Sequence, residues 1–333
     1  MSDIPAPKRS KGPSGLPTPA SSVVPPLPSS STSSSIPSVQ GLGEYKFRDG
    51  TEITPSGSMP QKKYYRSRAH ANPLSFNDNL TYPASPDLMD WGPYYPGGGA
   101  AAAGGAAGAP TVLDIGCGFG GLTIELATLL PDSNVLGLEI RAKVCEYVRL
   151  RIMALRDRFL DGREGEEDGG GGGAGGEDGG TGEGEGRPGH SYNNCAVLRS
   201  NTMKNLVNYM QPGSLDKIFI CFPDPHFKAK NHRRRIVSYD LLTEYAYLLK
   251  PDALLYLITD VKALHEWHLE KAESHEGFER VSEGLDADPC VKAMINVTEE
   301  GKKVERSGSD KYYAVYRRLP DEEIVVKAKG DYF

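Results

Sequence analysis

The chain reads TVLDIGCGFGG over residues 111–121, where an apolar run meets a cluster of glycines. Residues 111–116 have the length and composition of a buried strand, and Gly120 to Leu130 read as a helix. Glycine at such a strand-to-helix turn lets the backbone approach a ligand, and the first turn of the helix offers free N–H groups. The stretch therefore predicts a ligand site at this turn.

The alternation of strand and helix continues beyond this turn. The expected strands are 134–140, 194–200, 215–222 and 253–260, and the expected helices are 142–160, 203–210, 236–250 and 264–274. Strands and helices that take turns predict an α/β fold with a mostly parallel, doubly wound sheet. The runs 278–282 and 312–319 follow without an obvious crossover helix between them, so we expect them to form a terminal antiparallel hairpin.

An acidic residue accompanies the glycine turn. Glu139 ends the next expected strand, 18 residues after Gly121, where a carboxylate can accept hydrogen bonds from both hydroxyls of a ribose. The glycines also satisfy G-x-G-x-x-G, which leaves a nicotinamide or flavin cofactor open. Asp114 lies just ahead of them, and D-x-G-x-G-x-G after a strand resembles the S-adenosylmethionine (SAM) motif of class I methyltransferases. SAM is therefore the favoured cofactor.

A second candidate site is the loop CFPDPHFK, residues 221–228, which follows the expected strand 215–222. It falls at the carboxyl edge of the predicted sheet, where open α/β folds bind ligands. Two prolines stiffen the loop and hold Asp224 in one place, while Phe222 and Phe227 are available to stack on a base. Asp224 is therefore the candidate catalytic residue, although an Asp in a proline-rich turn also has an ordinary structural role.

A cluster of cations follows this loop, with no acid before Asp240. Its members are Lys228, Lys230, Arg233, Arg234 and Arg235. Clustered cations gain affinity for a phosphate-rich polymer by counterion release, so these five residues predict a nucleic-acid contact beside the active site. The alternative is a solvated charged surface. His265 and His268 are three residues apart, but no third ligand is evident, so no metal site is expected.

Composition separates segments that we expect to fold from segments that we do not. The chain has 333 residues with 39 Gly, 25 Pro and 38% hydrophobic residues, which is lean for a compact protein of this length. We predict a disordered Pro/Ser-rich tail at 1–60, one domain at 61–320 with flexible insertions at 97–109 and 161–189, and a C-terminal tail at 321–333.

The formal net charge of -6 misleads about partners, because it is unevenly distributed. Residues 161–187 hold nine acidic and two basic residues, so the rest of the chain carries a net charge of +1. The five cysteines contain no C-x-x-C pair and predict neither a disulfide framework nor a zinc knuckle. No apolar stretch approaches the roughly 18 residues of a spanning helix, so membrane insertion is not expected.

Longer motifs extend along the chain, among them RAHANP (68–73), LGLEIR (136–141), LRSNTMK (198–204), FPDPHFKAKNHRRRI (222–236) and TEEGKKVER (298–306). Together they closely resemble the eukaryotic tRNA (guanine-N7)-methyltransferase catalytic subunit, over about residues 61–319. The resemblance implies a Rossmann-like class I methyltransferase fold that uses SAM to methylate N7 of a guanine in the tRNA variable loop. It also implies a heterodimer with a non-catalytic WD-repeat β-propeller subunit, located in the nucleus.

The resemblance implies roles for single residues as well. Residues implied to line the SAM pocket are Gly116, Glu139, Ile140, Arg141, Asn201, Thr202 and Cys221. Asp224 would be the active-site acid, and Thr298 and Glu300 would close the pocket. The familiar form of the family has Ala where this chain has Thr202, which affects the expected packing on adenine.

The expected chemistry depends mainly on alignment. Guanine N7 already carries an exposed lone pair, so the enzyme has to place N7, the methyl carbon and sulfur in line. We expect Asp224 to accept hydrogen bonds from guanine N1–H and the amino group and to stabilise the cationic purine, without acting as an obligatory general base. Two rival functions are a NAD-type dinucleotide-dependent oxidoreductase, which would use the same glycines, and a noncatalytic RNA-binding module with a vestigial pocket.

Overall fold

The computed structural model describes residues 36–40, 58–68, 71–75, 80–100, 108–160, 187 and 189–324. They form one seven-stranded sheet with the order β3-β2-β1-β4-β5-β7-β6. The strands are β1 (Val112–Ile115), β2 (Val135–Glu139), β3 (Cys195–Arg199), β4 (Leu215–Cys221), β5 (Leu249–Thr259), β6 (Phe278–Val281) and β7 (Tyr312–Arg318). The first five pair in parallel, whereas β7 runs antiparallel to β5 and β6. The predicted sheet is confirmed.

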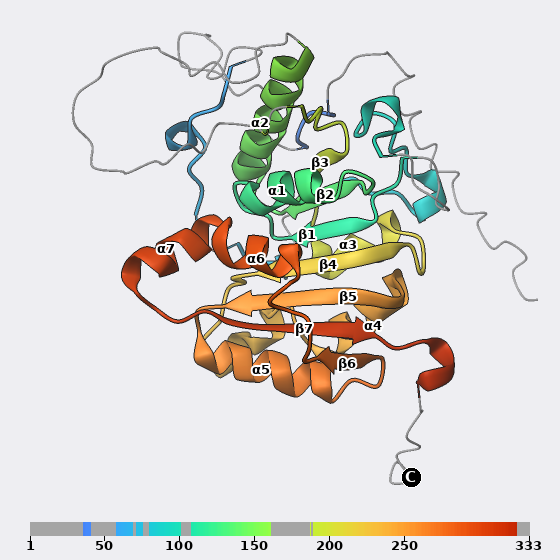
Figure 1. Ribbon diagram of the computed structural model, residues 1–333, viewed down its shortest axis with the longest axis vertical. Coiled ribbons are helices and arrows are strands. Elements are labelled where there is room, and N and C mark those ends of the chain that lie inside the picture. The colour runs from blue at the N-terminus through green and yellow to red at the C-terminus, as the bar shows by residue number, and fades with distance from the viewer. Residues whose placement is uncertain are drawn as a thin grey trace, which may run out of the picture. The chain divides into compact units, whose positions relative to one another are not determined.

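Helices cover both faces of the sheet, and α1 and α6 lie on the side that faces the viewer in Figure 1. The helices are α1 (Gly121–Leu129), α2 (Ala142–Leu160), α3 (Thr202–Tyr209), α4 (Tyr239–Leu248), α5 (Lys262–Glu273), α6 (Pro289–Asn296) and α7 (Glu299–Ser307). None of the helices in the described ranges is both long and apolar enough to cross a membrane.

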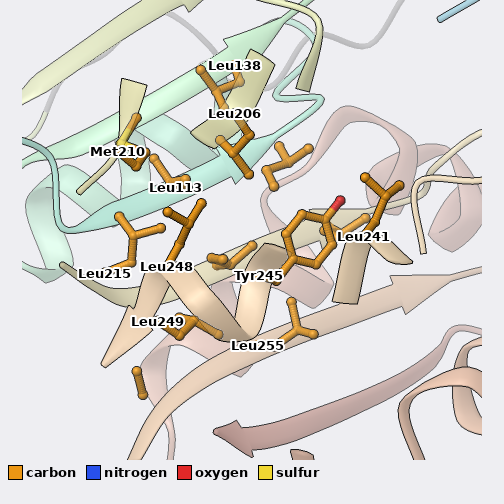
Figure 2. Packing of buried hydrophobic residues seen from close by; sticks show 14 of the residues in the cluster. Leu113, Leu138, Leu206, Met210, Leu215, Leu241, Tyr245, Leu248, Leu249 and Leu255 are labelled. Carbon is orange, nitrogen blue, oxygen red and sulfur yellow. The ribbon is translucent and has the colours of Figure 1, made fainter. Parts of the chain in front are cut away.

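Successive strand residues point to opposite faces of the sheet and feed two buried clusters. Leu113 and Leu255 join Leu206 of α3 and Tyr245 of α4 in one cluster, as Figure 2 shows. Side chains of α1, α2 and α6 form the other cluster with the alternate strand residues, such as Val112. The central strands are therefore buried on both faces, which is why they read as continuous apolar runs in the sequence.

The chain changes direction in the sheet between β1 and β4. From β1 it proceeds to β2 and β3 on one side, and then crosses to β4 and β5 on the other. In open α/β sheets, such a switch point leaves a crevice at the carboxyl ends of the strands, where ligands bind. The turns after β1, β2 and β4 are therefore the place to look for a site.

The connection between β6 and β7 differs from the expectation. The two strands are antiparallel as predicted, but α6 and α7 lie between them, so they are not a simple hairpin. α7 buries only Gly301 and Val304, and therefore carries too weak an apolar pattern to be recognised. The TEEGKKV stretch is the start of this helix instead of a polar turn, and the Thr298 hydroxyl accepts from Gly301 N at 3.0 Å as its N-cap.

Part of the predicted N-terminal tail packs against the domain. Ile36 is 1% exposed and belongs to the cluster on the α2 side. Gln40 exchanges two hydrogen bonds with Thr81, at 3.1 and 2.8 Å. The packed part of the chain therefore includes residues N-terminal to position 61. Most of the predicted tails and insertions, at 1–35, 41–57, 101–107, 161–186 and 325–333, lies outside the described residues.

Candidate active site

A pocket of about 220 Å³ lies at the carboxyl ends of the central strands. Its wall includes nine of the predicted site residues: Gly116, Glu139, Ile140, Arg141, Asn201, Thr202, Cys221, Asp224 and Arg234. Ala71 and Pro73, from the segment before the sheet, complete one side. The glycine turn after β1 and the Asp224 loop after β4, 100 residues apart in the sequence, thus share one cavity.

The turn after β1 has a backbone that only glycine adopts without strain. Gly116, Gly118 and Gly120 have φ values of 75°, 55° and 78°, in the left-handed region where a Cβ is unfavourable. Gly116 N and Cys117 N both donate to the carbonyl of Leu138 in β2, at 2.8 and 3.1 Å. The turn is therefore held open beside the pocket, and α1 begins at its end.

Asp114 lies beneath this turn as a buried acid. Its side chain is 2% exposed, and Oδ2 accepts a 2.7 Å hydrogen bond from the hydroxyl of Thr123. Burial raises the pKa of Asp114 to about 7, the Thr123 bond opposes the rise, and the charges of Glu299 and Glu139 add to it. A cationic amino group bound at the turn would favour the ionised form.

The pH dependence of stability reports this buried acid. Because the folded pKa of Asp114 is about 7, above its usual 3.8, the unfolded state loses this proton at lower pH than the folded state. The unfolding free energy of the ligand-free protein therefore falls as pH rises from about 4 to 7. Asp114→Asn keeps an oxygen for Thr123 and removes the titration. We expect the unfolding free energy of the variant to rise relative to that of the wild type by up to about 4 kcal/mol between pH 4 and 7. Above pH 7 the difference should stay constant.

Urea unfolding of both proteins at pH 4 to 8 measures this difference. The exposed Asp132 provides the control, because Asp132→Asn changes a surface carboxyl near the end of α1. A difference between Asp114→Asn and the wild type that stays constant across this pH range would contradict the buried titration.

Glu139 lies at the end of β2, and its carboxylate is hydrogen-bonded by Arg141. It is 4% exposed, and Arg141 bonds both of its oxygens: Oε1 accepts from the Arg141 backbone N at 2.8 Å and from Nε at 3.1 Å, and Oε2 accepts from Nη2 at 2.8 Å. Burial alone would lower the pKa of Arg141. The hydrogen bonds to Glu139 and the charge of Glu139 raise this pKa above its usual value, and the charge of Glu300 adds to the rise. One acceptor site of Oε2 is left for a ribose hydroxyl, and a second bond to the ribose requires the Arg141 side chain to move.

Asn201 joins the pocket to the segment before the sheet. The residue is 2% exposed, and its Nδ2 donates to the carbonyl of Pro73 at 2.7 Å. This bond places Pro73 in the pocket wall. One N–H of the Asn201 amide is therefore used, and its carbonyl accepts from Lys204 N and Asn205 N, so Oδ1 and the second N–H remain for a cofactor. Neighbouring Thr202 is the first residue of α3.

The Asp224 loop is held in a strained conformation. Phe222 and His226 have φ values of 49° and 45°, which cost non-glycine residues on the order of 1 to 3 kcal/mol each. Asp224 Oδ1 accepts from His226 N at 3.3 Å, and Oδ2 lies 3.6 Å from His226 Nδ1. Phe222 N also donates to Ile258 of β5 at 2.8 Å. These contacts fix the Asp224 carboxylate in the pocket wall.

Arg235 supports this loop, and it is not available to contact nucleic acid as predicted. Its side chain is 7% exposed, its Nε donates to Pro225 O at 2.9 Å, and its guanidinium lies 4.6 Å from the centre of the Trp267 ring. Trp267 of α5 is itself held by a 2.7 Å bond from Nε1 to Val237 O. Arg235 therefore connects the Asp224 loop to α5.

The other four cations of the cluster differ from Arg235 in that none of them is buried. Lys228, Lys230 and Arg233 are exposed and outside the pocket. Arg234 lines the pocket, and its Nε is buried without a hydrogen-bond partner in the described part of the chain. A contact of these four residues with nucleic acid stays a prediction.

Two residues implied to close the pocket are not in its wall. Thr298 caps α7, and Glu300 pairs with Lys303 at 2.7 Å on the surface of that helix. Glu299 lies over the start of α1, because a Cβ added to Gly121 would approach its Oε2 to 3.2 Å. α7 therefore packs beside the glycine turn.

Several pocket residues were absent from the sequence-based site. Pro73 and Ala71 precede β1 by about 40 residues, and no spacing rule links them to it. His226 lines the pocket beside Asp224, and its place in the same loop was the available signal, whereas Phe222, which was expected to be available to a base, also lines the pocket.

Comparisons with known proteins agree with this arrangement. The family described as putative methyltransferase matches residues 108–314. The tRNA (guanine-N(7)-)-methyltransferase of Kluyveromyces lactis is 46% identical over 269 residues, covering 80% of this chain and 87% of that protein. The enzyme of the same name from Podospora anserina is 45% identical over 285 residues, covering 79% of this chain and 90% of that protein.

Solved structures resemble the chain more remotely. The 16S rRNA methyltransferase KamB is 13% identical with a TM-score of 0.39, and the match covers 63% of this chain and 87% of that one.

Proposed function

This chain belongs to the family of tRNA (guanine-N(7)-)-methyltransferases, and from that premise we propose that it methylates N7 of a guanine in the variable loop of tRNA with SAM as the methyl donor. The observation that carries the proposal is the shared pocket. Glu139 and the glycine turn form one end, and Asp224 and Arg234 line the same cavity. A nucleoside cofactor and a base can thus meet within it.

The residues of the pocket fit SAM. Glu139 offers a buried carboxylate for the ribose hydroxyls, and the glycine turn lets the backbone approach the cofactor closely. Asp114 lies beneath this turn, outside the pocket wall, and its ionised form would favour a cationic amino group. Ile140 and Thr202 supply walls for a base. SAM, when bound, supplies a methyl group on a sulfonium, and the chain has to position the acceptor nitrogen against it.

Asp224 gives the pocket its selectivity for guanine. Its carboxylate can accept hydrogen bonds from guanine N1–H and the exocyclic amino group, which adenine does not present in that pattern. Methylation at N7 makes the purine cationic, and a fixed carboxylate stabilises that charge as it develops. The strained loop that holds Asp224 avoids reorganisation during the reaction. Asp224 therefore recognises guanine and stabilises the cationic purine, and no proton has to leave N7.

Methyl transfer from labelled SAM to tRNA tests this proposal. Borohydride and aniline cleave RNA at 7-methylguanosine, so cleavage in the variable loop of the product would establish both the chemistry and the site. SAM binding without any transfer to tRNA would leave the cofactor and overturn the substrate. Binding of RNA without binding of SAM would instead support the noncatalytic rival.

We also propose that the chain works as a heterodimer with a non-catalytic WD-repeat β-propeller subunit in the nucleus. The support is the resemblance of its FPDPHFK and TEEGKKVER motifs to the eukaryotic catalytic subunit. Activity on tRNA should rise when the WD-repeat protein of the same cell is co-expressed, and a fluorescent fusion should concentrate in the nucleus. Equal activity with and without that protein would contradict the first part, and a cytoplasmic fusion the second.

A further inference from the structure

Phe227 is unusually exposed for a large apolar residue. Its side chain is 75% exposed, more than any other large apolar side chain in the described ranges. Its neighbours Asp224 and His226 line the pocket, but Phe227 does not. The ring therefore lies outside the cavity, on the loop that carries the candidate catalytic carboxylate.

The two phenylalanines of this loop differ in what they can do. Phe222 packs against the cluster on the α1 and α6 side, and a Cβ on Gly301 would lie 3.5 Å from its ring. Phe222 is thus a core contact that also lines the pocket, whereas Phe227 presents its ring outside the cavity, where a base next to the target can reach it.

The backbone that carries Phe227 is fixed on both sides. His226 before it has its strained φ of 45°, and Arg235 bonds to Pro225 O at 2.9 Å. After it, Asn231 N donates to Lys228 O at 2.8 Å within the 3₁₀ helix η4 (Ala229–Arg234). A rigid backbone that presents a bare aromatic ring loses little conformational entropy when the ring binds a partner.

The surroundings of Phe227 favour RNA as that partner. Lys228, Lys230 and Arg233 are exposed within the six residues that follow it in the chain, and none of them forms a salt bridge within the described residues. Cations that track a phosphate backbone, next to an aromatic ring that accepts a base, are the combination found in sites for unpaired nucleic acid. An apolar protein partner would not need three adjacent unpaired cations.

We propose that Phe227 stacks on a nucleobase adjacent to the target guanine in the tRNA. A guanine that enters the pocket has to leave its stack, and the base next to it then loses one stacking face. Phe227 at the rim offers a ring to replace that face. This inference rests on the proposed function, since it concerns how the same site handles its substrate.

Kinetics of four variants with wild-type tRNA provide the first test. Phe227→Ala and Phe227→Leu should lower kcat/KM for tRNA about 10-fold or more, and Phe227→Trp should stay near the wild type, because Trp retains a stacking surface. SAM affinity and thermal midpoint should not change. Tyr247→Ala is the matched control, since Tyr247 is an exposed aromatic residue of α4, 56% exposed. Its carbonyl accepts a hydrogen bond from Gly213 N, which precedes β4, so Tyr247 lies at the sheet edge opposite the pocket.

Substrates with an abasic nucleotide on the 5′ or 3′ side of the target guanine provide the second test. With the base that Phe227 contacts removed, the wild type should slow to the level of Phe227→Ala, and the variant should slow no further. The inference is overturned if Phe227→Ala matches the wild type on intact tRNA, or if its defect persists on both abasic substrates. If the wild type itself forms no 7-methylguanosine, the proposed function fails, and this inference fails with it.

Discussion

Asp224→Asn is expected to lower kcat for tRNA methylation by about 10²- to 10³-fold while leaving SAM affinity unchanged. Asparagine keeps the size of the side chain, but it has one acceptor oxygen and no charge to stabilise the cationic purine. The Asp224 loop is fixed by its strained φ values and by the bond from Arg235, so the variant should keep the wild-type backbone. The loss therefore belongs to the chemical step.

Single-turnover rates with enzyme in excess separate this step from tRNA binding. Asp216→Asn is a suitable control, because Asp216 lies at the opposite end of β4, where it pairs with Lys250 at 2.7 Å. A wild-type rate that depends steeply on the ionisation of one basic group, with that dependence absent in Asp224→Asn, would indicate a general base and contradict the role proposed for Asp224.

Arg235→Lys is expected to lower kcat on the order of 10²-fold, because a small displacement of a catalytic group has effects of that size. Lysine keeps the positive charge, but it cannot both lie flat on Trp267 and donate to Pro225 O. The Asp224 loop then loses its connection to α5. The KM for tRNA should change little, since the buried Arg235 side chain does not reach the surface.

The exposed Arg233 gives the contrasting result. Arg233→Gln should raise the KM for tRNA, reduce its dependence on salt and leave kcat unchanged, because an exposed cation contributes through phosphate contacts. Steady-state kinetics of both variants at several salt concentrations make the comparison. An Arg235→Lys variant with a raised KM for tRNA and an unchanged kcat would instead indicate that Arg235 contacts nucleic acid. Recovery of SAM binding at wild-type affinity shows that the variant is folded.

The central sheet could be predicted from sequence because its strands are buried on both faces. Such strands appear as uninterrupted apolar runs, and the long helix α2 has the same bounds, 142–160, in sequence and structure. α7 could not be predicted in this way, since one valine and one glycine are all that it buries. Its N-cap Thr298, followed by acidic residues, was the only local signal.

The candidate site was predictable where one local motif carries one function. The glycine turn and the Asp224 loop follow strands, and parallel strands bring their carboxyl ends together. Arg235 was misread because a run of basic residues gives charge but not burial, and the ring that covers it, Trp267, lies 32 residues later. The place of Pro73 in the pocket likewise depends on a tertiary contact, its bond from Asn201.

The most direct test of the account uses tRNA transcripts in which 7-deazaguanine replaces the variable-loop guanine. This base keeps the edge that Asp224 is proposed to read, but carries C–H where guanine has N7. We predict that the wild-type enzyme, co-expressed with the proposed WD-repeat subunit, binds both transcripts alike and transfers labelled methyl only to the one with guanine. Undiminished transfer to the 7-deazaguanine transcript would contradict the claim that this pocket aligns N7 with the methyl group of SAM.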